Sequence, residues 1–141
     1  MKKAKILTAG DSALLIEFEQ KIAPEINAQI TAFVHLLKEQ HIEGVTDLIP
    51  AFASLLINYD PRVIGYKDLK ARIEELLKIE VNEEAGDARV FEIPVCYGGE
   101  YGPDIANIAE NAGISEQEVI DIHCSKDYLI YMLGFLPGFV Y

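Results

Sequence analysis

Basic residues are scarce in this sequence, tryptophan is absent, and cysteine occurs only twice. The 12 lysines and arginines stand against 23 aspartates and glutamates, which gives a formal net charge of -11 at pH 7. Because nucleic-acid binding needs clustered Lys and Arg, this balance argues against a nucleic-acid partner. The two cysteines, Cys96 and Cys124, lie far apart and form no CxxC motif, which indicates free thiols in a cytoplasmic protein.

Long apolar runs are missing as well. No run approaches the roughly 20 residues of a membrane-spanning helix, and the opening Met1-Lys2-Lys3 lacks the apolar core of a signal peptide, so no membrane association is expected. The histidines, His35, His41 and His123, do not stand at metal-ligand spacing with the cysteines, so no metal site is expected either. Hydrophobic residues still make up 50% of the chain, which is enough for a packed core.

Residues 1 to about 82 contain hydrophobic patterns of two kinds. A period of two residues predicts strands, and a helical period predicts amphipathic helices. The strands are expected at Ala4–Thr8, Ala13–Glu19, Val45–Ile49 and Ser54–Tyr59, and the helices at Ile22–Gln40 and Tyr66–Ile79. An antiparallel sheet with two helices on one face is a compact two-layer α+β domain.

A polar segment, Asn82–Asp87, follows this part of the chain. It contains glycine and lacks large hydrophobic residues, which predicts a linker. Beyond it the pattern predicts, in order, a strand at Arg89–Tyr97, a glycine-rich loop at Gly98–Asp104, a helix that Gly113 ends, a helix from the capping box Ser115–Glu118 to about His123, and a strand at Tyr128–Leu133.

The segment Gly10-Asp11-Ser12 has the residue order found at the nucleophile of some serine hydrolases. That chemistry needs the serine at the start of a helix, and a histidine with a nearby aspartate late in the chain. Here a strand is expected after Ser12, and the late candidates are limited to Asp121 and His123. A β-turn is therefore the favoured interpretation.

Two further places are candidates for ligand binding. His123 ends a capped helix, where the helix dipole favours a protonated imidazole; a surface cap is the commoner role there and a functional residue the alternative. Gly98 and Gly99 precede a helix N-terminus, which suits anions, but no Gly-Lys-Ser/Thr follows as in a P-loop. A structural turn is favoured at these glycines over a ligand-facing loop.

The least ordinary segment is the aromatic turn at residues 134–141. Glycine frees its backbone and proline stiffens it, so the segment has a defined shape. Its candidate ligand-binding residues are Phe135, Pro137, Gly138, Phe139 and Tyr141. Exposed turns seldom carry so many aromatic residues, so the turn either walls a small-ligand pocket or packs in a core.

Three segments together give the chain a family resemblance. They are, in order, Gly10–Ile16 (GDSALLI), Ile93–Asp104 (IPVCYGGEYGPD) and Tyr131–Tyr141 (YMLGFLPGFVY). With these motifs the chain resembles the family of 5-oxoprolinase B subunits, also called allophanate hydrolase subunit 1. The same family includes the inhibitor of the sporulation histidine kinase A. The helix end at Val119–His123 also matches, and the resemblance covers the whole chain.

The resemblance implies a domain organisation. Residues 1–85 are expected to form a small N-terminal α+β domain, and residues 88–141 the beginning of a cyclophilin-like β-barrel domain. By the same resemblance this second domain is incomplete in the chain. An exposed strand edge beside Phe135, Phe139 and Tyr141 favours self-association.

The resemblance also implies a function. Its enzyme members open 5-oxoproline to L-glutamate with ATP, a hydrolase reaction that this chain would perform only with the partner subunits A and C, which complete the ATP site. His123 is then expected to donate a proton or hold a carboxylate, and Gly98 and Gly99 to offer backbone N–H groups to an anion. The aromatic turn is expected to line the cavity. The alternative is a regulatory protein, not an enzyme, that inhibits a sensor histidine kinase in sporulation control.

Overall fold

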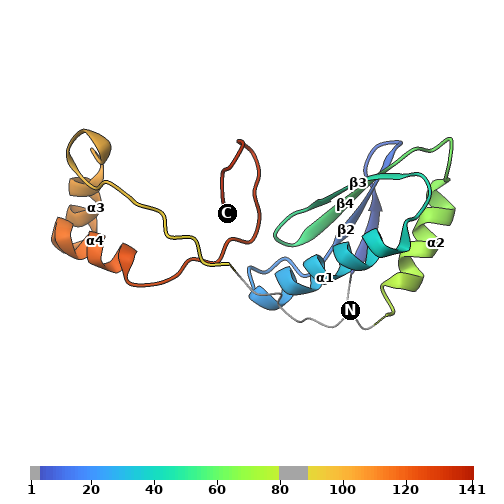
Figure 1. Cartoon of the computed structure of the whole chain (residues 1–141), viewed down its shortest axis with the longest axis horizontal. Helices are drawn as coiled ribbons and strands as arrows, with labels where there is room; N and C mark the ends of the chain where they lie inside the picture. The colour runs from blue at the N-terminus through green and yellow to red at the C-terminus, as the bar shows by residue number, and fades with distance from the viewer. Residues whose placement is uncertain (1–3, 80–88) are drawn as a thin grey trace. The chain divides into compact units, whose positions relative to one another are not determined.

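The computed structural model describes residues 4–79 and 89–141, and the chain divides into two units. One unit is Met1–Gly86 together with Ile130–Tyr141, and the other is Asp87–Leu129 (Figure 1). Residues 80–88 are outside the described part of the chain. They include the expected linker, Asn82–Asp87, and the expected domain limits at residues 85 and 88. The domain limits therefore stay a prediction.

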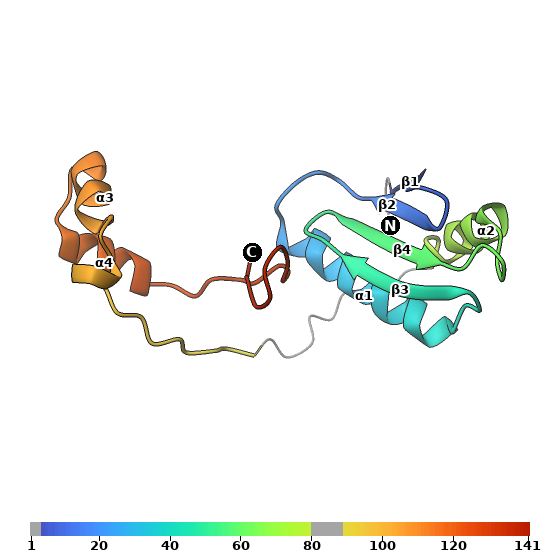
Figure 2. The same cartoon turned by 90° about the horizontal axis from the view of Figure 1, so that it is seen from above.

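The first unit contains a four-stranded antiparallel sheet of order β1-β2-β4-β3 (Figure 2). Its strands are β1 (Lys5–Thr8), β2 (Ala13–Glu17), β3 (Val45–Pro50) and β4 (Ser54–Tyr59). The central pair aligns Leu15 with Leu56. All four strands were expected from the sequence, and their ends agree to within two residues.

Two helices, α1 (Pro24–Gln40) and α2 (Tyr66–Leu76), cover one face of this sheet. Pro24 stands in the first turn of α1, where its missing N–H costs no hydrogen bond. The helix ends at His41, which adopts a left-handed conformation with φ 44°. The predicted α+β architecture, a sheet with two helices, is confirmed.

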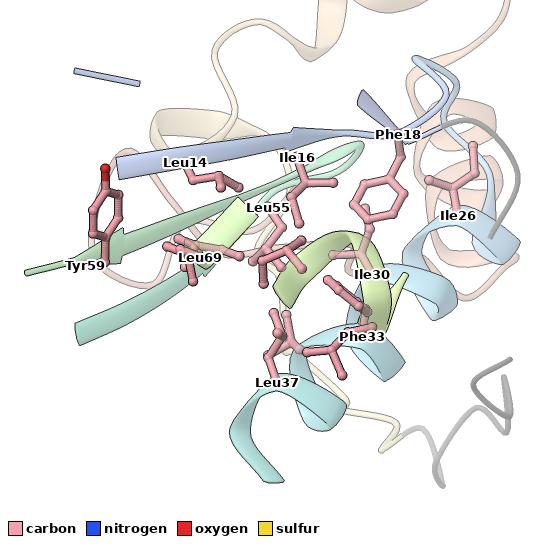
Figure 3. Packing of buried hydrophobic residues seen from close by; sticks show 14 of the residues in the cluster. Leu14, Ile16, Phe18, Ile26, Ile30, Phe33, Leu37, Leu55, Tyr59 and Leu69 are labelled. Atoms are coloured by element: carbon pink, nitrogen blue, oxygen red, sulfur yellow. The ribbon is translucent and has the colours of Figure 1, made fainter. Parts of the chain in front are cut away.

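The core of the unit lies between the sheet and the helices (Figure 3). Every second residue of β2 and β4 points into it, because side chains alternate along a strand. Its most completely buried members are Leu14, Ile16, Ile30, Phe33, Leu55, Ile57, Leu69 and Ile73. Full burial of one such side chain stabilises the fold by about 1.5–3 kcal/mol.

An ion pair closes the turn that follows β4. The guanidinium group of Arg62 contacts Asp60 with Nη2 2.7 Å from Oδ2, and both Nε and the backbone N–H of Arg62 donate to Oδ1. The side-chain hydrogen bond from Arg62, and then its backbone N–H, lower the pKa of Asp60 to about 2. A depressed carboxyl pKa stabilises the fold above the ordinary value of 3.8 and loses that effect as the pH falls through about 2.

We expect the variant Arg62→Ala to raise the pKa of Asp60 toward 3.8, because the largest cause of the depression is removed while the backbone N–H remains. Carboxyl carbon chemical shifts measured during an acid titration give this value directly. Arg72→Ala is the matched control, since it removes a guanidinium group that faces Glu75 instead. An Asp60 midpoint that stays near 2 in Arg62→Ala would contradict the assignment.

The second unit holds a short 3-10 helix, η1 (Gly99–Tyr101), and two helices, α3 (Ile105–Ala112) and α4 (Glu116–Cys124), which lie side by side (Figure 1). The predicted capping box at the start of α4 is confirmed: Ser115 Oγ accepts from the backbone N–H of Glu118, and the Glu118 carboxylate accepts from the Ser115 N–H. These bonds from Ser115 lower the pKa of Glu118. Gly113 ends α3 in the left-handed conformation, as expected.

Two predicted strands are not found. Residues 89–97 form no strand. In Tyr128–Leu133 an isolated bridge joins Leu133 to Val140, and Tyr131 and Met132 share backbone hydrogen bonds with Tyr141, but no strand forms. The physical reason is that alternating apolar residues favour an extended backbone, but a strand needs a hydrogen-bonded neighbour. Among the described residues no such neighbour is found beside residues 89–97. The start of a cyclophilin-like barrel stays a prediction.

Within residues 4–79 and 89–141, no helix is both long enough and apolar enough to span a bilayer.

Candidate functional site

His123 lies in the last turn of α4, where the sequence predicted it, and its ring is held by Tyr97. The Tyr97 hydroxyl group is hydrogen-bonded to Nδ1 of His123. The two rings meet edge to face, with centroids 5.7 Å apart and planes at 75°. Sequence reasoning singled out His123 but missed Tyr97, which comes 26 residues earlier.

Cys124 is the second neighbour of the Tyr97 hydroxyl group. Its Sγ lies 3.5 Å from the phenol oxygen. The hydrogen bond with Cys124, followed by partial burial of the phenol, raises the pKa of Tyr97 to about 12. Tyr97 therefore remains a neutral phenol, able to donate a hydrogen bond, throughout the range in which histidine titrates.

Tyr128 and Lys126 complete the cluster. The Tyr128 ring lies 5.3 Å from the His123 ring, with the planes tilted by 33°. The ammonium group of Lys126 lies 5.4 Å from the centre of the Tyr128 ring, a cation–π distance. Lys126 and His123 are the two side chains of this cluster that can carry a positive charge.

The acidic neighbour expected for His123 plays a different role. Asp121 accepts a hydrogen bond from Nε2 of Gln117 at 2.8 Å, which is an ordinary contact one helical turn away. Ser12 was the candidate nucleophile in the hydrolase interpretation. Its Oγ donates to Oδ1 of Asp11 at 3.0 Å in the connection before β2. Ser12 thus lies in the short connection between β1 and β2, which the Ala9 N–H closes by donating to the Ala13 carbonyl at 3.0 Å, and a strand, not a helix, follows it as expected.

The glycine-rich loop has the backbone shape expected of a turn. Gly98 and Gly99 both adopt positive φ, 77° and 55°, which residues with a Cβ rarely do. A Cβ at Gly102 would lie 2.6 Å from the backbone N of Gly98, so the loop closes on itself. Tyr97 directly precedes Gly98, so the same stretch that forms the loop also reaches His123.

The loop does not fit the triphosphate of ATP. Its two charged side chains, Glu100 and Asp104, are carboxylates, and residues 98–104 contain no Lys or Arg. Phosphate groups are held by cationic side chains together with backbone N–H groups. Across residues 4–79 and 89–141, no group of three His, Cys, Asp or Glu side chains is placed to hold a metal ion.

The aromatic turn belongs to the other unit and has a defined backbone. Gly134 N–H donates to the Phe139 carbonyl at 3.0 Å, and Phe139 N–H donates to the Leu136 carbonyl at 3.0 Å. Gly138 takes φ 77°, and Phe135 also has positive φ. The Phe135 side chain is 91% exposed, so it does not pack in a core.

Phe139 and Tyr141 lie together on the strand-like arm of this turn. Their ring centroids are 5.1 Å apart and the planes meet at 76°. About half of each side chain is exposed. The structure thus brings Phe139 and Tyr141 together, while His123 and Gly98 belong to the second unit. The ligand-binding role of the turn, Pro137 and Gly138 included, stays a prediction.

Residues 4–141 match the protein family described as carboxyltransferase domain, subdomain C and D, and the chain belongs to this family. Among its relatives, the B subunit of 5-oxoprolinase from Bacillus subtilis is 40% identical over 140 residues, which are 92% of this chain and 58% of that protein. The protein of the same name from Escherichia coli O157:H7 is 31% identical over 144 residues, 100% of this chain and 63% of the relative. The resemblance to the 5-oxoprolinase B subunits is therefore confirmed.

Solved structures agree with the fold. The crystal structure of TTHA0988 superimposes with a TM-score of 0.73 at 32% identity, and the match covers 91% of this chain and 24% of that one. The chain spans about three fifths of the length of the curated relatives it matches, 58% and 63%.

Proposed function

We propose that this protein is the B subunit of a cytoplasmic, ATP-dependent 5-oxoprolinase, which opens 5-oxoproline to L-glutamate together with partner subunits A and C. The observation that carries the proposal is the 40% identity with the 5-oxoprolinase B subunit of Bacillus subtilis over 92% of this chain. The chain is not expected to be active alone, because the resemblance implies that the partner subunits complete the ATP site.

In this proposal, His123 is the residue that acts on the substrate. Opening a lactam adds water to the carbonyl carbon, breaks the C–N bond and leaves a carboxylate and a protonated amine. By the resemblance, we expect His123 to donate a proton or to hold a carboxylate, and Lys126, whose ammonium group lies against the Tyr128 ring, adds positive charge to the cluster. A positioned group that gives a proton to the reacting atoms contributes about 10²–10⁴-fold in rate. ATP is assigned to the partner subunits, since Glu100 and Asp104 leave no phosphate cradle at the loop.

Reconstitution tests the proposal. The chain is mixed with subunits A and C from the same source, and conversion of 5-oxoproline to glutamate is followed in the presence of ATP. We expect turnover with all three proteins and none when this chain is left out. His123→Ala should lower turnover by about 100-fold or more, whereas His41→Ala, at the exposed end of α1, should not. Undiminished turnover without this chain would overturn the proposal.

The alternative function gives a different result in a separate assay. An inhibitor of a sensor histidine kinase lowers autophosphorylation of that kinase at micromolar concentration and does not change 5-oxoproline turnover. No contact in the described part of the chain favours this role, so it stays a prediction from the resemblance.

A further inference from the structure

The Tyr97 hydroxyl group has two neighbours but only one hydrogen to donate. Its oxygen contacts Nδ1 of His123 and lies 3.5 Å from Sγ of Cys124. The contact with Nδ1 is the closer one, and an imidazole nitrogen is a much better acceptor than sulfur. The phenol hydrogen therefore goes to Nδ1, and the Cys124 thiol, itself a weak donor, donates S–H to the phenol oxygen.

We propose that Tyr97 is a positioning residue, which keeps the proton of neutral His123 on Nε2 and directs that N–H to an oxygen atom of a cyclic amide substrate. The substrate class rests on the proposed function, whereas the tautomer rests on the geometry alone. Because Nδ1 is occupied as an acceptor, neutral His123 has no free lone pair on its ring. It acts as a hydrogen-bond donor and not as a general base.

The surroundings of the ring support a fixed orientation. Tyr97 holds one edge of the imidazole, and the Tyr128 ring covers one face at 5.3 Å. Tyr97 is itself part-buried, so its hydroxyl group is less free to rotate toward water than that of an exposed tyrosine. His123 itself is exposed, which leaves Nε2 open to a ligand.

The tautomer is measured on the chain itself by nitrogen NMR of its histidines at about pH 8, where free imidazole is neutral. We expect wild-type His123 to show an acceptor signal at Nδ1 and a protonated Nε2. In Tyr97→Phe, which keeps the ring and removes the hydroxyl group, the His123 signals should move toward those of the exposed His35 and His41. Tyr101→Phe, on the same loop but 72% exposed, is the control and should leave them unchanged.

Two NMR results would overturn the inference. One is a wild-type His123 that carries its proton on Nδ1, and this result needs no variant at all. The other is a set of His123 signals that Tyr97→Phe leaves in place, provided that protection of the α4 amides shows the helix is intact.

Turnover by the assembled enzyme provides a second test of the inference. We expect Tyr97→Phe to lower kcat by about 10- to 100-fold, as loss of orientation does, and to have no further effect in a His123→Ala background. Full additivity of the two substitutions would contradict action through His123. If the wild-type proteins show no 5-oxoproline turnover, the proposed function fails while the NMR result still decides the tautomer. If turnover is normal but the tautomer is wrong, the inference about Tyr97 fails alone.

Discussion

Phe33→Ala is expected to lower the free energy of unfolding of the sheet-containing unit by about 3–5 kcal/mol. Phe33 is 0% exposed in the middle of α1, where it packs among the side chains between the helices and the sheet (Figure 3). Alanine removes a whole ring, and the close-packed neighbours collapse only partly into the cavity. Since domains of this size are stable by about 5–15 kcal/mol, the loss is a large share of the total.

Urea unfolding followed by circular dichroism measures this change. Ile22→Ala is the matched control, because it also deletes a large apolar side chain next to α1 but at a position that is 73% exposed. The control is expected to change stability by less than about 0.5 kcal/mol. If the two substitutions lowered the free energy of unfolding equally, Phe33 would not be a buried core residue.

Gly44→Ala is expected to cost about 3 kcal/mol, from two separate causes. Gly44 has φ 90°, which strains any residue with a Cβ. In addition, the new Cβ would lie 2.7 Å from Cγ2 of Ile64 and 3.2 Å from Cβ of Val63, so a neighbouring segment must move. The Gly44 carbonyl also accepts a hydrogen bond from the Asp60 N–H at 2.8 Å, which ties that movement to the turn after β4.

Gly10→Ala separates the two causes. Gly10 has a similar φ of 73°, but nothing lies within 4 Å of its Cβ position. This substitution therefore carries only the backbone strain, about 1–2 kcal/mol. The difference between the two midpoints in urea unfolding gives the cost of the clash. Equal destabilisation by the two variants would show that Ile64 and Val63 move aside without any loss of stability.

The sequence predicted the first unit well because its apolar residues follow the period of each element. In α1, Ile26, Ile30 and Phe33 recur at the helical period in the sequence, and all three are buried. In β4, Leu55 and Ile57 alternate with less buried residues. Local pattern and tertiary packing agree at these positions, so the pattern alone was sufficient.

The second unit was predicted less well, because the sequence of one segment does not show whether another segment pairs with it. Residues 89–97 alternate like a strand, yet a strand exists only where another backbone accepts its hydrogen bonds. The Ser115 cap was found because its partner, Glu118, is three residues away. Tyr97 was missed for the opposite reason: its bond with His123 joins positions 26 residues apart, and no spacing rule connects a loop tyrosine to a helix end.

The strand order β1-β2-β4-β3 has a consequence for how the first unit folds. Each outer strand pairs with its neighbour in the chain, so the hairpins β1–β2 and β3–β4 close over short turns. The central pairing of β2 with β4 instead closes a long loop that contains all of α1. Closing such a loop is entropically expensive and slows folding. Formation of α1 shortens that loop, so we expect the helix that builds the core also to speed the meeting of the two hairpins.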